Sequence, residues 1–159
     1  MGSMQRTKGQ AGEREIAALL ADLTGFDVRR RVRQHDGDSD LEGIPGWSLE
    51  VKRHARATPG LIRQWWDQAV AQAERTGTLP VLAYRQDRGE WRMVWMLAPL
   101  LGVQQAAMWT DCAWTIEGTP HAWVAAMREI GAQRALAGLR GAAKRDAGAV
   151  CTVESSEQC

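Results

Sequence analysis

The chain has 159 residues, a formal net charge of +1 and a hydrophobic share of 45%. This length suits one domain with a buried core. No apolar run approaches the roughly 20 residues that cross a bilayer, and no signal peptide is visible, so we expect no membrane association and a cytoplasmic location. The three cysteines are odd in number and lack metal-ligand spacing, which favours a reducing environment.

An amphipathic helix is predicted over residues 10–24, ended by Gly25. Its apolar positions recur at i, i+3, i+4 and i+7: Ile16, Leu19, Leu20 and Leu23. Glu13 lies about one turn before this ridge. An acid in a first turn is favoured by the helix dipole, and it can also sit at the edge of the buried face.

A strand is predicted over residues 26–33. Arg29, Arg31 and Arg33 share one face of it, while Arg30 shares the apolar parity. Three like charges on one strand face repel one another, which favours an anionic partner such as a phosphate backbone over a merely solvated face.

The stretch from Asp38 to Lys52 organises the chain. Apolar and polar residues alternate over residues 47–52, so Glu50 and Lys52 share one face of a predicted strand. Asp40 lies upstream, and the turn signal at residues 44–46 can fold it back beside Glu50. Two carboxylates suffice for Mg²⁺, which keeps several waters, and a neighbouring lysine can orient the attacking water. A surface strand with a Glu–Lys pair is the alternative.

A basic loop follows Lys52 and carries Arg53 and Arg56. A helix is then predicted from about Leu61 to Arg75. Adjacent Trp65 and Trp66 are expected to face different ways, with one reaching a subunit interface. Next comes a predicted β-hairpin, residues 78–85 and 91–97, and the pattern turns helical from residue 98.

These segments resemble the archaeal-type Holliday junction resolvases of the PD-(D/E)XK nuclease superfamily, over roughly residues 7–97. The matching segments are residues 8–15, 25–30, 49–52, 79–83 and 89–92, together with Asp40. The resemblance implies a restriction-endonuclease-like α/β fold, with an αβββαββ core and a mixed central sheet flanked by helices. We expect a core domain at 5–97, a C-terminal helical extension at 98–146 and a flexible tail at 147–159.

The resemblance also implies the site. Catalytic roles fall on Glu13, Asp40, Glu50 and Lys52, and Mg²⁺ (with Mn²⁺ as a substitute) would be held by Asp40, Glu50, the Val51 carbonyl and Glu13. Asp40 is favoured over Asp38 because Leu41 and Gly43 follow it as in the family. Expected DNA contacts come from the basic segments and from a glutamine on the second helix: Lys8, Arg14, Arg29, Arg30, Arg31, Arg33, Arg53, Arg56 and Gln68.

Three functions fit these expectations. The first is a Mg²⁺-dependent endonuclease that resolves four-way junctions as a homodimer, in the host cytoplasm if the chain is phage-encoded. The second keeps the chemistry on duplex or flap DNA, as a restriction-like, nicking or repair nuclease. The third is a DNA-binding module without hydrolysis, whose acids form a solvated edge.

Overall fold

The computed structural model describes residues 2–31, 39–103 and 107–151, with side chains described for 9–31, 39–103 and 107–135. The elements begin α1 (Gly2–Thr24), β1 (Arg29–Arg30), β2 (Leu41–Glu42), β3 (Trp47–His54), α2 (Pro59–Thr76), β4 (Leu79–Gln86) and β5 (Arg92–Met96). This is the predicted αβββαββ order. The 3₁₀ helices η1 (Ala107–Thr110) and η2 (Cys112–Trp114), the strand β6 (Thr115–Gly118) and the helix α3 (Pro120–Cys151) follow.

The six strands form one sheet in the order β1-β2-β3-β4-β5-β6. Only the pair β3–β4 is parallel among these strands; the other neighbours are antiparallel. Parallel neighbours need a crossover connection, and α2 supplies it. The predicted mixed α/β sheet is therefore confirmed.

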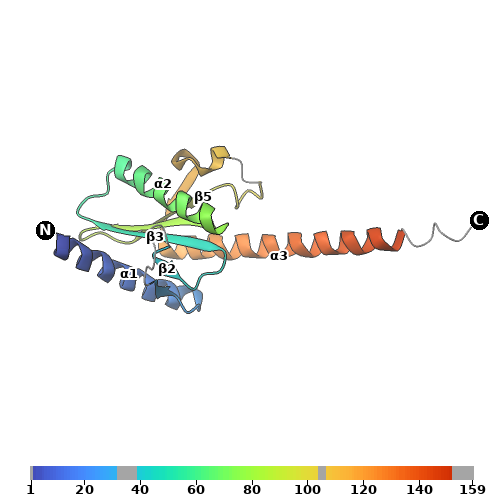
Figure 1. The fold of residues 1–159 in the computed structure, drawn as a ribbon, viewed down its shortest axis with the longest axis horizontal. Coiled ribbons are helices and arrows are strands. Elements are labelled where there is room, and N and C mark those ends of the chain that lie inside the picture. The colour runs from blue at the N-terminus through green and yellow to red at the C-terminus, as the bar shows by residue number, and fades with distance from the viewer. Residues whose placement is uncertain (1, 32–38, 104–106, 152–159) are drawn as a thin grey trace, which may run out of the picture.

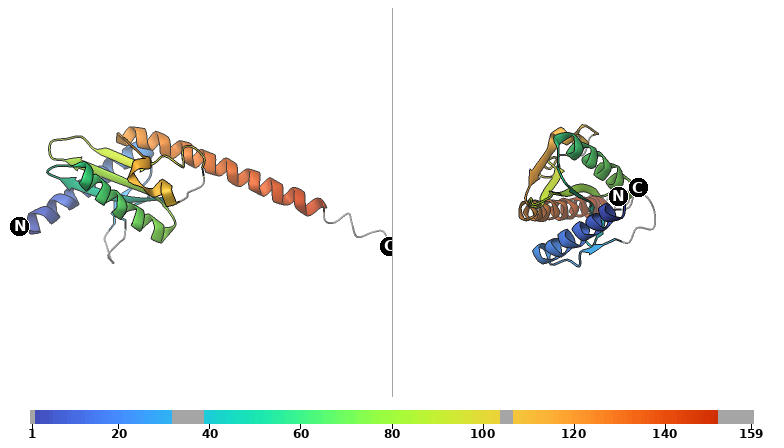
Figure 2. Two further views of the ribbon diagram at one scale, coloured as in Figure 1. Left: turned by 90° about the horizontal axis from the view of Figure 1, so that it is seen from above. Right: turned by 90° about the vertical axis from the view of Figure 1, so that its left-hand side faces the viewer.

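Helices cover both faces of the sheet. Leu49, Val51 and Val81 pack with the apolar ridges of α1 and of the first turns of α3. Leu82, Tyr84 and other side chains of the opposite face pack with α2. Figures 1 and 2 show α2 on one side of the sheet and α1 and α3 on the other, with the remainder of α3 leaving the body.

Local signals set the helix ends. Gly25 ends α1 with φ 76° and an N–H bond to the Ala21 carbonyl at 2.9 Å, as predicted. The hydroxyl of Thr58 caps α2, and Gly77 ends it in the left-handed region. Pro59 opens α2, so this helix is slightly longer than the predicted 61–75.

Three predictions were wrong in detail. The strand expected from residue 26 is only β1 within the described residues, because the Val28 N–H bonds the Phe26 carbonyl in a tight turn. Residues 107–118 form short 3₁₀ helices and a strand that pairs with β5, where a helical extension from residue 98 was expected. The sheet therefore continues past residue 97 through β6. The core does so too, because Trp123 of α3 is fully buried in it.

The third error concerns Trp65 and Trp66, which are both buried in the same cluster. The Trp66 indole N–H donates to the Thr110 carbonyl at 2.7 Å, so the η1 segment covers that flank of α2. Trp65 lies beside Tyr84 and His54. Neither tryptophan is therefore free to reach a subunit interface in this chain.

No helix in the described ranges has both the length and the apolar character needed to cross a membrane.

Candidate active site

The candidate site is built on β3 and on the residues just before β2. Leu41 pairs with Leu49, and this antiparallel register sets Asp40 beside the middle of β3. The Asp40 N–H bonds the Leu49 carbonyl at 2.9 Å, and the Val51 N–H donates to Asp40 Oδ2 at 2.8 Å. Asp40 is thus held at a fixed place next to Glu50, as the turn signal predicts.

Ser39 fastens this segment to β3. Its hydroxyl accepts from the Leu49 N–H at 3.0 Å and lies 2.8 Å from the Leu41 carbonyl and 3.0 Å from the Leu49 carbonyl. Because all these groups are buried, each bond stabilises more than it would in water. The hydroxyl therefore positions Asp40 without touching its carboxylate.

Glu50 is 0% exposed and Asp40 is 1% exposed. Lys52 forms an ion pair with Glu50 Oε1, and the Gln72 amide of α2 donates to Glu50 Oε2 at 2.5 Å. A buried carboxylate is costly unless it is paired and hydrogen-bonded, and both oxygens of Glu50 are. The predicted strand faces are confirmed, since Glu50 points to α2 while Leu49 and Val51 pack against α1.

Gln72 was missed by the sequence interpretation, which chose Gln68. In the structure Gln68 is exposed and Gln72 is buried. The signal was present: Gln72 lies three residues after Ala69 and seven after Trp65, which places a polar side chain on the apolar stripe of α2.

Glu13 has its ion-pair partner outside this group. Its carboxylate forms an ion pair with Arg30, and both belong to the side of the sheet covered by α1. Within the described ranges, no three His, Cys, Asp or Glu side chains are grouped to hold a metal ion. The expected convergence of three carboxylates is therefore not seen, and a metal role for Glu13 stays a prediction.

The donor set nevertheless fits Mg²⁺. The ion prefers oxygen ligands and commonly takes one or two carboxylates while keeping waters. Asp40, just before β2, and Glu50, on β3, are two buried carboxylates, and the Val51 N–H donates to Asp40. Asp38, the competing candidate, lies outside the described residues.

The arginines predicted to contact DNA differ in their ion-pair partners and in their exposure to solvent. Arg29 is paired with Asp27 and Arg31 with Glu42, the latter at 3.6 Å. The hydrogen bond from Arg29 lowers the pKa of Asp27 below its ordinary value, so this exposed pair persists into acid. Arg14 and Arg56 are exposed and Arg53 is half-buried. Arg33 and the side chain of Lys8 lie outside the described parts.

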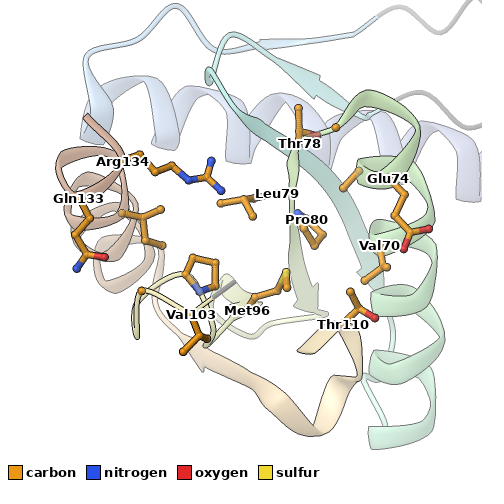
Figure 3. A pocket seen from close by; sticks show the side chains of 15 residues that line it. Val70, Glu74, Thr78, Leu79, Pro80, Met96, Val103, Thr110, Gln133 and Arg134 are labelled. Carbon is orange, nitrogen blue, oxygen red and sulfur yellow. The ribbon is translucent and has the colours of Figure 1, made fainter. Parts of the chain in front are cut away.

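A separate cavity of about 550 Å³ lies between the end of α2, the start of β4 and α3. Figure 3 shows Val70 and Glu74 of α2 on one side and Gln133 and Arg134 of α3 on the other. None of Asp40, Glu50, Lys52 or Gln72 lines it. The cavity is therefore not the carboxylate site.

A carboxylate before one strand, a Glu-x-Lys on the next and a mixed αβββαββ sheet together define the PD-(D/E)XK class of nucleases. Residues 4–117 match the model of the family described as "Phage putative PDDEXK endonuclease", and the chain belongs to this family. No curated protein matches the chain.

Among solved structures, the chain is similar to Hjc, a Holliday junction resolvase from the archaeal hyperthermophile Archaeoglobus fulgidus. The two share 22% sequence identity, with a TM-score of 0.41. The similarity covers 54% of this chain and 70% of that chain.

Proposed function

We propose that this nuclease is a Mg²⁺-dependent endodeoxyribonuclease that resolves four-way DNA junctions by paired, symmetric phosphodiester hydrolysis. The observation that carries the hydrolytic part is the pair of buried carboxylates, Asp40 and Glu50, with the half-buried Lys52 beside them; the Val51 N–H and Gln72 hold the carboxylates. The choice of a four-way junction rests on the resemblance of the ordered sequence motifs to the archaeal-type resolvases.

In this proposal Asp40, Glu50 and the Val51 carbonyl hold the ion. Bound Mg²⁺ supplies a more acidic water and offsets charge on the phosphate. The chain provides the remaining functions. The Val51 N–H fixes one oxygen of Asp40, Gln72 fixes one oxygen of Glu50, and the Lys52 ammonium stands where it can orient the attacking water or stabilise the charged transition state.

A homodimer is part of the proposal. A four-way junction has near two-fold symmetry, and a two-fold pair of sites can cut opposed strands symmetrically. Arginines would contact backbone phosphates and read shape more than base edges. Mn²⁺ is expected to replace Mg²⁺, and the host cytoplasm remains the expected location.

The test is a strand-mapped digestion of an immobile four-way junction with Mg²⁺, with Mn²⁺ and with EDTA. We expect symmetric paired cuts with either metal and none with EDTA. Equal rates on a duplex of the same sequence would replace the resolvase function with a restriction-like or nicking one.

Two variants test the site itself. Glu50→Gln and Lys52→Gln should each abolish cutting while junction binding in EDTA stays within a few-fold of the unmodified chain. If both variants cut at the normal rate, the assigned site is wrong. If neither variant nor the unmodified chain cuts any branched or duplex substrate, a non-catalytic binding module is the better description.

A further inference from the structure

Two arginines stand side by side where β3 and β4 end. Arg53 and Arg85 are direct partners in the parallel ladder, so their side chains leave the same face of the sheet. That face is the one covered by α1, because Gly12 of α1 packs on Arg53. Neighbouring strands lie about 4.8 Å apart, and like charges at that spacing repel each other.

Arg85 has a carboxylate partner. It forms an ion pair with Glu15 of α1, and its guanidinium lies 5.6 Å from the centre of the Trp91 ring. The Trp91 indole N–H donates to the same Glu15 oxygen at 3.1 Å. One carboxylate and one ring therefore fix the position of Arg85.

Arg53 has no such partner. Among the residues with described side chains, no ion pair involves Arg53, and its buried Nε has no hydrogen-bond partner. The aliphatic part of Arg53 nonetheless packs closely against α1. A Cβ atom added to Gly12 of that helix would lie only 3.3 Å from Arg53 Cβ and 3.5 Å from the Trp91 ring. The Nε of Arg85 is likewise buried without a hydrogen bond. Together the two arginines and Glu15 carry one surplus positive charge.

We propose that Arg53 and Arg85 jointly bind one backbone phosphate of the DNA. This phosphate would lie on the face of the sheet that α1 covers, opposite to the face of Glu50 and Lys52. Guanidinium forks match phosphate oxygens, and a phosphate between the two would remove their mutual repulsion. Both side chains keep part of their surface in solvent. Arg53 directly follows Lys52 on β3, but the two side chains leave opposite faces of the sheet, so the bound phosphate is a separate contact from the reacting one. The inference rests on the proposed function for the identity of the anion.

The first test measures the binding of a labelled four-way junction in EDTA over a range of salt concentrations. Loss of one phosphate contact should lower the slope of log K against log salt by about 0.9. We expect this decrease for Arg53→Gln and a restored slope for Arg53→Lys. Arg92→Gln is the matched control, because Arg92 is paired with Glu117 at 3.0 Å on β5 and should leave the slope unchanged.

The second test removes the competing carboxylate. Glu15→Gln should free Arg85 and tighten junction binding several-fold at low salt, even if the variant is less stable to heat. Glu117→Gln, which frees Arg92 instead, should not tighten binding. A purely structural role for the arginine pair predicts a lower melting temperature with no gain in affinity.

The outcomes separate the two proposals. An unchanged salt slope for Arg53→Gln, or no DNA binding by the unmodified chain, overturns the phosphate site. Cleavage of the junction together with an unchanged slope leaves the nuclease proposal standing alone. A lowered slope in a chain that never cuts DNA with Mg²⁺ leaves the phosphate site standing and removes the proposed function.

Discussion

Gln72 and Gln68 differ by one helical turn, yet only Gln72 reaches the buried carboxylate of Glu50. The choice between them depends on how α2 is rotated against the sheet. That rotation follows from the packing of Trp65 and Trp66, which the sequence pattern assigned to different surroundings. Asp40, Glu50 and Lys52 were predictable because a two-residue period and a turn are local signals, whereas the Glu13–Arg30 pair depends on the placement of α1.

Gln72→Ala should destabilise the fold by about 1.5–3 kcal/mol, because it removes a hydrogen bond to a buried ionised group. It should also lower kcat, since Glu50 loses one of the two groups that orient it. Chemical denaturation and single-turnover cleavage measure the two effects. Gln68→Ala is the control, and a surface change of this kind should stay within about 0.5 kcal/mol. Equal effects of the two variants would contradict the assignment.

Tyr84 provides a pH-dependent prediction. Burial, with the nearby Glu117 carboxylate, raises the pKa of Tyr84 to about 12. The folded state then favours the neutral phenol, so its stabilising contribution is fully present below the ordinary pKa of about 10 and is lost as the pH rises through the folded value. Tyr84 is the only tyrosine of the chain, so absorbance at alkaline pH reports this group alone. A midpoint near 10 in the folded protein would refute the prediction.

At the scale of elements, the turn between β2 and β3 holds the site together. Gly43 has φ 104°, and an added Cβ would lie 2.2 Å from the Asp27 carbonyl oxygen. Gly46 has φ 79° with no atom near the position of a Cβ. The sequence predicted a turn here, but the close approach of the chain at Asp27 is a tertiary contact that no local pattern encodes.

Gly43→Ala should therefore be far more destabilising than Gly46→Ala. The second change carries only the strain of a left-handed residue, about 1–2 kcal/mol. The first adds a backbone clash that must displace the Asp27 segment, which disturbs β1 and the position of Asp40. Thermal unfolding of the two variants checks the order. Similar melting temperatures would show that this turn tolerates movement.

At the scale of the whole molecule, α3 has two parts. Its first turns place Trp123, Val124, Met127 and Ile130 in the core, while the rest of the helix leaves the body (Figure 1). The sequence predicted a helix here but not that its start completes the core. The reason is that Trp123 meets Trp47 of β3, with ring centroids 5.5 Å apart, across a long separation in the chain.

A chain ended after residue 135 should keep its fold and melt within a few degrees of the full chain, because the buried side chains described for α3, the last of them Ile130, are retained. Trp123→Ala in the full chain should cost about 3–5 kcal/mol by leaving a cavity. Circular dichroism melts compare the two. A large loss of stability in the shortened chain would mean that residues beyond 135 contribute to the core.

The outermost strands of the described sheet are both short, two residues for β1 and four for β6. Charged side chains stand on both, at Arg29 and Glu117. Short, charged edge strands leave few backbone N–H and C=O groups with which a strand of another molecule could pair. This discourages edge-to-edge aggregation. Any pairing of two copies should consequently engage helices or loops, and concentrated samples should resist fibre formation.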